Sequence, residues 1–329
     1  MYSSRFLRSL SHFKHYDATP HIGTVFTDSN VQLSRLLSSV DSDNTIKDLA
    51  VLVSHRGVVF FKDQDLNIEQ QRQLATRLGE LSGKPSSSGL HRHPLTPDGT
   101  DLGDEVLTIS SAKRVPGDGA GRASRRWHTD VTYEPVPSDY ATLKMATAPS
   151  SGGDTLWASA YEAYDRLSPA FRKFLEGLTA LHSASEFHDY AKAAGFVVSP
   201  GPRGSPLNVG TDLSAVHPVI RTHPVTGYKA LYVNKVFTRK IMELSQEESE
   251  EVLSFLARHV AENHDMQVRY KWEKNDVAIW DNRCTFHTPT YDYDELRVGN
   301  RVVSLGEVPY FDPNSKSRRE DLMAEKGNQ

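Results

Sequence analysis

The chain has 329 residues, enough to bury a sizeable core without disulfides or a structural metal. Charged residues make up 24% and hydrophobic residues 38%, and the net charge is −4 with acids and bases spread along the chain. This balance argues against a nucleic-acid partner, and no apolar run approaches the ~20 residues of a membrane span. The single cysteine, Cys284, cannot form an internal disulfide, which predicts a reducing compartment and a cytoplasmic protein.

The N-terminal part is predicted to alternate short strands and helices after a flexible start. Residues 1–16 carry three basic residues, several serines and no acid. We expect a solvated N-terminus there, with a transit peptide as the alternative. Residues 57–61, Gly-Val-Val-Phe-Phe, are typical of a buried strand. Residues 67–81 predict a helix, because Asn67 can cap it, Gln70 completes a capping box, and leucines recur on one face.

The middle of the chain combines a long loop with extended structure. Residues 85–121 are rich in Gly, Ser, Pro and Asp, and such long loops often serve as lids or binding loops. Residues 127–147 are predicted to be extended. A helix is expected after Ser168, with Pro169 in its first turn, and residues 199–212 form a Gly/Pro-rich loop.

The C-terminal part begins with a second capping box, Ser245-Gln246-Glu247-Glu248, which predicts another helix. Short strands are then expected at residues 267–272, 276–280 and 301–305. Residues 312–329 are charged and predict a solvated tail. Short strands with peripheral helices indicate a mainly β (α+β) fold of the sandwich or jelly-roll type, in one domain over residues 1–329.

The segment Trp127-His128-Thr129-Asp130 indicates a metal site. On a strand, residues two apart point to the same face, so His128 and Asp130 would direct an imidazole and a carboxylate to one point. A third ligand must come from elsewhere. His287 follows an apolar strand and a polar turn, and is a candidate. Two histidines and one carboxylate with open positions are the pattern of Fe(II) oxygenases.

The same spacing also occurs in proteins that bind no metal. An isolated His-x-Asp is more often a surface or hydrogen-bonded pair, and the chain has 14 histidines. His91-Arg92-His93 would also place two imidazoles on one strand face, though without a carboxylate. Periodicity alone does not choose between the two pairs.

If the cosubstrate of such an Fe(II) oxygenase is 2-oxoglutarate, charge balance predicts how the protein would bind it. Fe²⁺ with one carboxylate and two neutral imidazoles keeps a charge of +1, which the chelating carboxylate of the cosubstrate offsets. The distal carboxylate still needs a buried cation, for which arginine is suited. Arg297 and Arg301 follow the last candidate ligand. In an extended chain they would share a face with backbones ~13 Å apart, and would serve two different anions.

Four segments in order carry a family resemblance. They are Trp-His-Thr-Asp-Val-Thr at 127–132, Gly-Gly-Asp-Thr-Leu-Trp-Ala-Ser at 152–159, His-Pro-Val-Ile-Arg-Thr-His-Pro at 217–224, and Trp-Asp-Asn-Arg at 280–283. The chain resembles the taurine dioxygenase family of Fe(II)/2-oxoglutarate-dependent dioxygenases, and looks closest to its fungal members. The resemblance covers about residues 57–313. It implies a double-stranded β-helix (jelly roll) and an oxidoreductase that uses Fe(II), 2-oxoglutarate and O₂.

The resemblance also implies roles for eight side chains. They are the metal ligands His128, Asp130 and His287, the 2-oxoglutarate-binding Thr155 and Arg297, and the substrate-binding Arg301, His93 and Phe237. The expected reaction oxidises a C–H bond of a small anionic substrate, an alkylsulfonate or amino acid, and releases succinate and CO₂. Desaturation or oxidative ring closure of an amino acid is the alternative. Thr96 and Ser124 depart from the family pattern, which puts taurine itself in doubt.

Two functions of other kinds stay open from the residues alone. A zinc hydrolase could use the same three ligands, but it would leave Thr155 and Arg297 without a purpose. A non-catalytic jelly-roll module that binds an anion would leave the three metal ligands without a role. The composition is compatible with a homo-oligomer.

Overall fold

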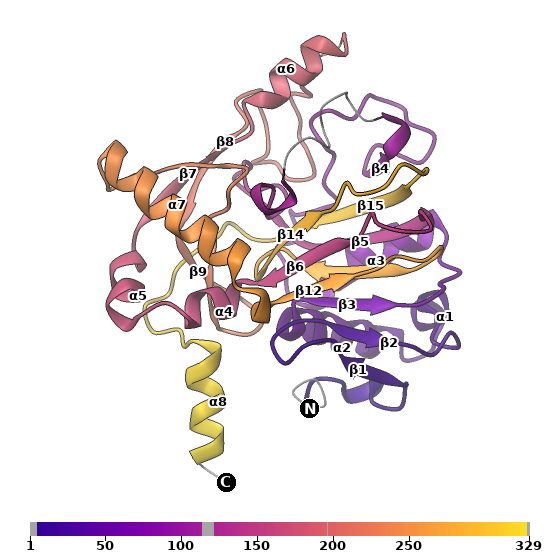
Figure 1. Cartoon of the computed structure of the whole chain (residues 1–329). Helices are drawn as coiled ribbons and strands as arrows, with labels where there is room; N and C mark the ends of the chain where they lie inside the picture. The colour runs from indigo at the N-terminus through magenta and orange to yellow at the C-terminus, as the bar shows by residue number, and fades with distance from the viewer. Residues whose placement is uncertain (1–4, 114–121, 196, 328–329) are drawn as a thin grey trace.

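A computed structural model of the protein describes residues 5–113, 122–195 and 197–327. Its largest element is a seven-stranded sheet of order β1-β2-β3-β13-β5-β15-β4 (Figure 1). The strands are β1 (His15–Asp17), β2 (Thr24–Phe26), β3 (Val58–Phe61), β13 (Val277–Asp281), β5 (Ser138–Thr147), β15 (Val298–Leu305) and β4 (Val106–Ser110). β2 and β3 pair in parallel, and the other neighbours pair antiparallel.

A three-stranded sheet packs against the large one. It consists of β12 (Gln267–Tyr270), β6 (Thr155–Ser159) and β14 (Thr285–Pro289). Both sheets contribute to one apolar cluster. Phe60 of the large sheet stacks on Tyr270 with ring centroids 4.0 Å apart, and lies edge-on to Trp157 at 5.3 Å. The predicted mainly β architecture with peripheral helices is therefore confirmed.

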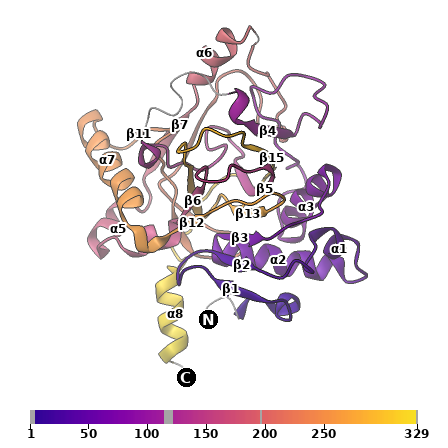
Figure 2. The same ribbon diagram turned by 45° about the vertical axis from the view of Figure 1, so that its right-hand side comes forward.

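Three helices cover the large sheet (Figure 2). They are α1 (Leu33–Ser38), α2 (Ser42–Arg56) and α3 (Ile68–Leu81). Leu49 of α2 and Leu74 of α3 are fully buried in a cluster with Phe61 and Ile279 of the sheet. Asn67 accepts a hydrogen bond from the Gln70 N–H and completes the predicted capping box. The apolar residues whose periodicity predicted α3 thus lie on the face that this helix buries.

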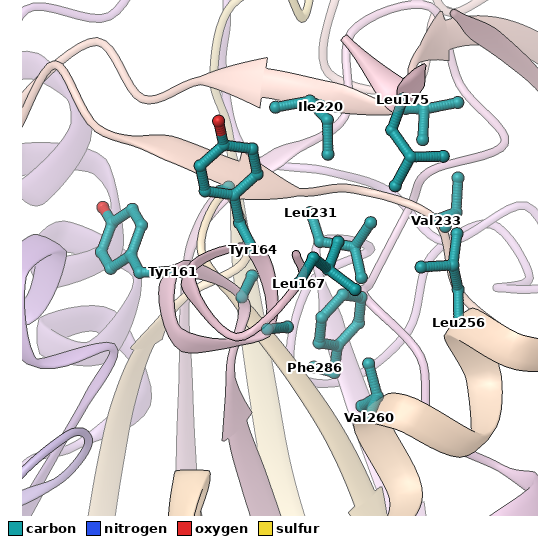
Figure 3. Packing of buried hydrophobic residues seen from close by; sticks show 14 of the residues in the cluster. Tyr161, Tyr164, Leu167, Leu175, Ile220, Leu231, Val233, Leu256, Val260 and Phe286 are labelled. Atoms are coloured by element: carbon teal, nitrogen blue, oxygen red, sulfur yellow. The ribbon is translucent and has the colours of Figure 1, made fainter. Parts of the chain in front are cut away.

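A third apolar cluster joins further helices and strands to β14 (Figure 3). The elements are α4 (Ala160–Asp165), α5 (Pro169–Leu175), α7 (Gln246–Glu262), β7 (Thr179–Ser183), β9 (Ile220–Thr222), β10 (Lys229–Leu231) and β11 (Thr238–Ile241), and β8 (Ser214–Pro218) pairs with β7. Leu167, Leu231 and Val260 meet Phe286 of β14 there. Ser168 and Ser245 cap α5 and α7, as their sequences predict. The described residues also include short 3-10 helices, namely η2 (Arg8–Leu10), η3 (Ser111–Lys113), η4 (Ala123–Arg125) and η5 (His264–Met266).

Three sequence predictions about local structure are corrected. Residues 5–16 are not a flexible start, because Leu7 and Leu10 are 2% and 0% exposed and pack in the cluster under α1 and α2. The predicted loop at 85–121 contains β4, which pairs with β15; its residues 114–121 lie outside the described part.

Among the described residues no helix is long and apolar enough to cross a membrane.

The predicted solvated tail also folds. It contains α8 (Arg318–Gly327), whose first residue is 3% exposed and donates a hydrogen bond from Nη2 to Glu162 Oε1 at 2.9 Å. Arg318 Nη1 donates to the His21 carbonyl at 2.8 Å. Glu162, in α4, also accepts from Arg166 Nε at 3.1 Å. One buried carboxylate therefore attaches the C-terminal segment to the body of the protein.

Glu162→Gln is expected to lower the free energy of unfolding by about 3 kcal/mol, because it leaves Arg318 buried without its carboxylate. Burial alone would raise the pKa of Glu162, but His21 and Arg318 hold that pKa below its ordinary value. The stabilisation is therefore complete above the unfolded-state pKa, about 4.3, and declines as pH falls below it. Urea unfolding at pH 7 and pH 4 measures both effects. Exposed Glu247→Gln is the control and should stay within about 0.5 kcal/mol of wild type.

Candidate active site

Three potential metal ligands meet where the segment before β5 touches β14. His128 and His287 form an antiparallel bridge in which each backbone N–H donates to the other carbonyl, at 3.0 and 2.8 Å. Nε2 of each imidazole lies 3.8 Å from a carboxylate oxygen of Asp130. The possible ligand atoms of all three residues lie within 4.8 Å of one another. The structure therefore brings the predicted triad together.

The route to this geometry differs from the predicted one. Residues 130–133 form a turn rather than part of a strand, and Val131 has φ 63°. A positive φ is rare for a β-branched residue, and such conformations cluster at functional sites. The Asp130 N–H donates to Asn282 Oδ1 at 3.1 Å, which fixes the start of the turn. Asp130 thus faces His128 because the chain turns back, and alternation along a strand plays no part.

The protonation states in the triad suit a divalent metal. His128 Nδ1 hydrogen-bonds the Arg126 carbonyl at 2.8 Å, so Nδ1 carries the proton and Nε2 is free to coordinate. Burial, with His128 beside it, lowers the pKa of His287 to about 3, which keeps that imidazole neutral. Burial alone would raise the pKa of Asp130, but Arg301 and the two histidines lower it to about 2.

One oxygen of the triad lacks a partner. Asp130 Oδ2 is buried without a hydrogen bond to any described residue. A charged oxygen in that state is costly unless a cation binds it. Two neutral imidazoles and one carboxylate, with one carboxylate oxygen unsatisfied, form a donor set that fits Fe(II).

Arg297 and Thr155 form a second polar site. Arg297 is 4% exposed, and its Nε donates to the Gly153 carbonyl at 2.9 Å while Nη2 lies 3.4 Å from Thr155 Oγ1. Trp272 Nε1 donates to the same hydroxyl oxygen at 3.0 Å. Gly153 has φ 68°, and a Cβ there would lie 3.1 Å from Arg297 Cδ, so only glycine allows this approach. A buried guanidinium beside a hydroxyl is suited to a carboxylate.

A cavity of about 150 Å³ lies beside the triad. The residues on its wall are His93, His128, Asp130, Val131, Tyr133, Phe187, Phe237 and Arg301. All three predicted substrate-binding residues are among them. The Phe237 ring lies 6.2 Å from that of His128, and His93 Nδ1 accepts from the Leu95 N–H at 3.2 Å.

Arg301 connects the cavity to the triad. It lies on β15, and its Nη1 donates to Asp130 Oδ1 at 2.6 Å. Its Nε is buried and has no hydrogen-bond partner among the described residues. Arg297 meets different partners, Gly153 and Thr155, so the two guanidiniums lie in different surroundings.

Residues 14–303 match the family described as "Taurine catabolism dioxygenase TauD, TfdA family". The chain belongs to this family. It is 45% identical to alpha-ketoglutarate-dependent dioxygenase btcD of Neocamarosporium betae, over 95% of this chain and 96% of the relative. It is 34% identical to the alpha-ketoglutarate-dependent sulfonate dioxygenase of Saccharomyces cerevisiae, over 89% of this chain and 67% of the relative.

A solved structure supports the family assignment. The crystal structure of a taurine dioxygenase from Burkholderia xenovorans superposes with a TM-score of 0.70 at 29% identity, over 92% of this chain and 94% of that one. The protein is therefore a 2-oxoglutarate-dependent dioxygenase, as the four sequence segments indicated, and its cosubstrates are 2-oxoglutarate and O₂.

Sequence reasoning missed four residues at the sites of this dioxygenase: Val131, Tyr133, Phe187 and Trp272. The first two fall in the segment predicted to be extended, in which Val131 and Tyr133 would face away from Asp130. Phe187 lies on α6 (Glu186–Ala193), a helix that the sequence does not predict. Its N-cap residue, Ser185, makes no side-chain capping hydrogen bond, and the helix buries only Ala191.

The second histidine pair, His91 and His93, lies in a different environment from the triad. His91 Nε2 lies 3.9 Å from Glu134 Oε1, and Glu134 forms a buried ion pair with Arg203. His93 points to the cavity, and the two rings are 6.2 Å apart. The two imidazoles therefore do not converge on one metal.

Thr96 and Ser124, the two departures from the family pattern, are absent from the cavity wall as described. Thr96 is buried, with its hydroxyl unpaired among the described residues. Ser124 is exposed on η4. Neither residue therefore lines the cavity directly.

A second cluster of possible ligands, His223, Asp281 and Cys284, has a structural role. Asp281 accepts two hydrogen bonds from the Arg283 guanidinium and one from His223 Nε2 at 2.9 Å. Burial raises the pKa of the Cys284 thiol well above its ordinary value, so the thiol stays protonated. Cys284 is therefore an inert residue of the core.

Proposed function

We propose that this dioxygenase uses Fe(II), 2-oxoglutarate and O₂ to oxidise a C–H bond of a small anionic substrate, an alkylsulfonate or an amino acid, and that it releases succinate and CO₂. The observation that carries the proposal is the shared cavity of Arg301, His128 and Asp130. His128, Asp130 and His287 would hold the iron, on a scaffold that the family resemblance implies is a double-stranded β-helix. Bound iron would supply the O₂ activation that oxidises the substrate carbon.

The cosubstrate would be oriented by Arg297 and Thr155. The guanidinium fork binds the distal carboxylate in a bidentate manner, and the Thr155 hydroxyl gives a third contact. Because both groups are buried, the carboxylate would bind away from water, where a charge pair is strong. This fixes one end of 2-oxoglutarate and leaves its other end to reach the triad.

The substrate would be held by its acidic group. Arg301 Nη2 belongs to a cationic group and makes no hydrogen bond to any described residue, and a substrate anion would satisfy it. His93, Phe187 and Phe237 would form the remaining wall. The cavity volume of about 150 Å³ limits the substrate to a small molecule. Relatives named for sulfonates and sulfate esters support an acidic substrate.

Taurine is expected to be a poorer substrate than alkanesulfonates of similar length. Asp130 is the one carboxylate on the described cavity wall, and a bound metal would occupy it, so the ammonium of taurine finds no acidic partner. Burying an unpaired ammonium is costly, and because amino acids carry the same group, we expect alkanesulfonates to rank above them as well. Succinate release, measured with alkanesulfonates, taurine and aliphatic amino acids under saturating iron and 2-oxoglutarate, ranks them by kcat/KM.

Neutral alcohols of matched length are the control for the acidic group. A clear preference for taurine would contradict the inference that its ammonium finds no acidic partner in the cavity. Turnover of neutral compounds with no turnover of anions would contradict the role of Arg301. A weak visible charge-transfer band on anaerobic addition of Fe(II) and 2-oxoglutarate tests the cofactor assignment separately.

A further inference from the structure

Tyr133 is a buried residue with a free polar group at the cavity. Its side chain is among the wall residues, and the residue is only 2% exposed. Its hydroxyl makes no hydrogen bond to any described residue, and it is not among the polar atoms that are wholly buried without a partner. The hydroxyl therefore keeps accessible surface, and for a residue that lines the cavity this surface opens into it.

Four other buried tyrosines in the described chain use their hydroxyls structurally, whereas the unpaired hydroxyl of buried Tyr232 is wholly buried. Tyr140 pairs with Ser54, Tyr161 donates to the Ser54 carbonyl, Tyr228 donates to Asp321, and Tyr270 donates to Asp276. Each of these bonds stabilises packing between elements of the fold. The Tyr133 hydroxyl has no such role, although buried Tyr hydroxyls usually find a partner.

The position of the Tyr133 ring is fixed. It packs edge-on against Phe187 at 5.3 Å and against Phe237 at 5.1 Å between ring centroids. Both neighbours are also on the cavity wall. Since the rings hold the phenol from two sides, the hydroxyl is preorganised for a ligand instead of being free to rotate toward the protein.

The hydroxyl is a donor at every physiological pH. Burial, with Glu134 nearby, raises the pKa of Tyr133 well above its ordinary value, although the Arg301 charge acts in the opposite direction. The phenol therefore keeps its proton. Tyr133 and Arg301 line the same cavity.

We propose that the Tyr133 hydroxyl is a second hydrogen-bond donor, beside Arg301, to the acidic group of the substrate, and that it helps to determine which anion is accepted. The inference rests on the proposed function. Arg301 Nη1 is engaged by Asp130 and Nε is wholly buried, which leaves Nη2 for the substrate. A desolvated anion has several acceptor sites and needs more than one donor. In a cavity of about 150 Å³, one small head group reaches both residues.

Tyr133→Phe removes the hydroxyl and keeps the ring packing. We expect kcat/KM for the best anionic substrate to fall about 10- to 100-fold, the range for losing a hydrogen bond to a charged group. The KM for 2-oxoglutarate and the charge-transfer band should not change. The probes are linear alkanesulfonates and alkanecarboxylates of equal chain length, together with the neutral alcohol of that length, whose turnover should be affected least.

Tyr164→Phe is the matched control. It removes a hydroxyl that bonds Glu176 and does not line the cavity, and it should keep wild-type kinetics. Anion kinetics within twofold of wild type in Tyr133→Phe would overturn the inference. An equal fall for anions and for the neutral alcohol, or a parallel loss of 2-oxoglutarate binding, would overturn it too, because the residue would then be structural.

The proposed function fails differently. If no anion is turned over or perturbs the charge-transfer band of the wild-type enzyme, the anionic substrate class is wrong and the role of Tyr133 is wrong with it. If anions bind wild type and Tyr133→Phe equally well, only the role of Tyr133 is overturned.

Discussion

Replacing His128 or His287 by alanine is expected to abolish Fe(II) binding and succinate formation, because a site with three protein ligands has no spare one. Both imidazoles reach the Asp130 carboxylate at 3.8 Å and have neutral forms suited to coordination. Equilibrium dialysis of Fe(II) gives a readout that is independent of turnover. Thermal unfolding shows whether each variant is folded.

Asp130→Ala should have the same effect on iron, with an added cost to stability. In the protein without metal, Arg301 would lose its carboxylate partner and stay buried. The histidine variants are therefore the cleaner test. His264→Ala, which removes an exposed imidazole on η5, is the control and should bind iron normally. Wild-type succinate formation in either histidine variant would remove that residue from the metal site.

Arg297→Ala is expected to raise the KM for 2-oxoglutarate by about 100- to 4,000-fold. The distal carboxylate would lose a buried charge partner, and such losses cost about 3–5 kcal/mol, with tenfold in affinity for each 1.4 kcal/mol. Arg297→Lys should recover part of the loss, since a lysine keeps the charge but cannot form the bidentate fork. Initial rates at varied 2-oxoglutarate and saturating iron measure both values.

Arg301→Ala is the matched comparison for Arg297. It should leave the KM for 2-oxoglutarate near its wild-type value and raise that for the anionic substrate. The opposite pattern, with the large 2-oxoglutarate defect in Arg301→Ala alone, would show that the two arginines have exchanged roles.

The fold was predictable where local chemistry is strong. Capping boxes at Asn67 and Ser245 gave the starts of α3 and α7, and apolar, β-branched runs gave β3 and β13. Prediction failed where long-range contacts decide the outcome. Leu7 and Leu10 are ordered by distant helices, and Arg318 is ordered by Glu162 of α4, and neither contact leaves a local signal.

At the candidate site too, local sequence signals were predictable and the three-dimensional path of the chain was not. The ligand types and the His-x-Asp spacing made the triad a candidate, and the family resemblance selected it, although the ligands converge through a turn and not through a shared strand face. The turn at 130–133 depends on a positive φ at Val131, which a β-branched residue does not suggest. Tyr133 was missed for that reason, since the turn brings it to the cavity together with Asp130.

The backbone bridge between His128 and His287 has a consequence for the thermodynamics of metal capture. The two ligands are far apart in sequence, and joining their ends in an unfolded chain would carry a loop-closure entropy cost. Here the pairing of the two backbones and the packing of the sheets overcome that cost when the protein folds. An incoming ion then meets ligands that are already assembled, and more of its coordination energy appears as affinity.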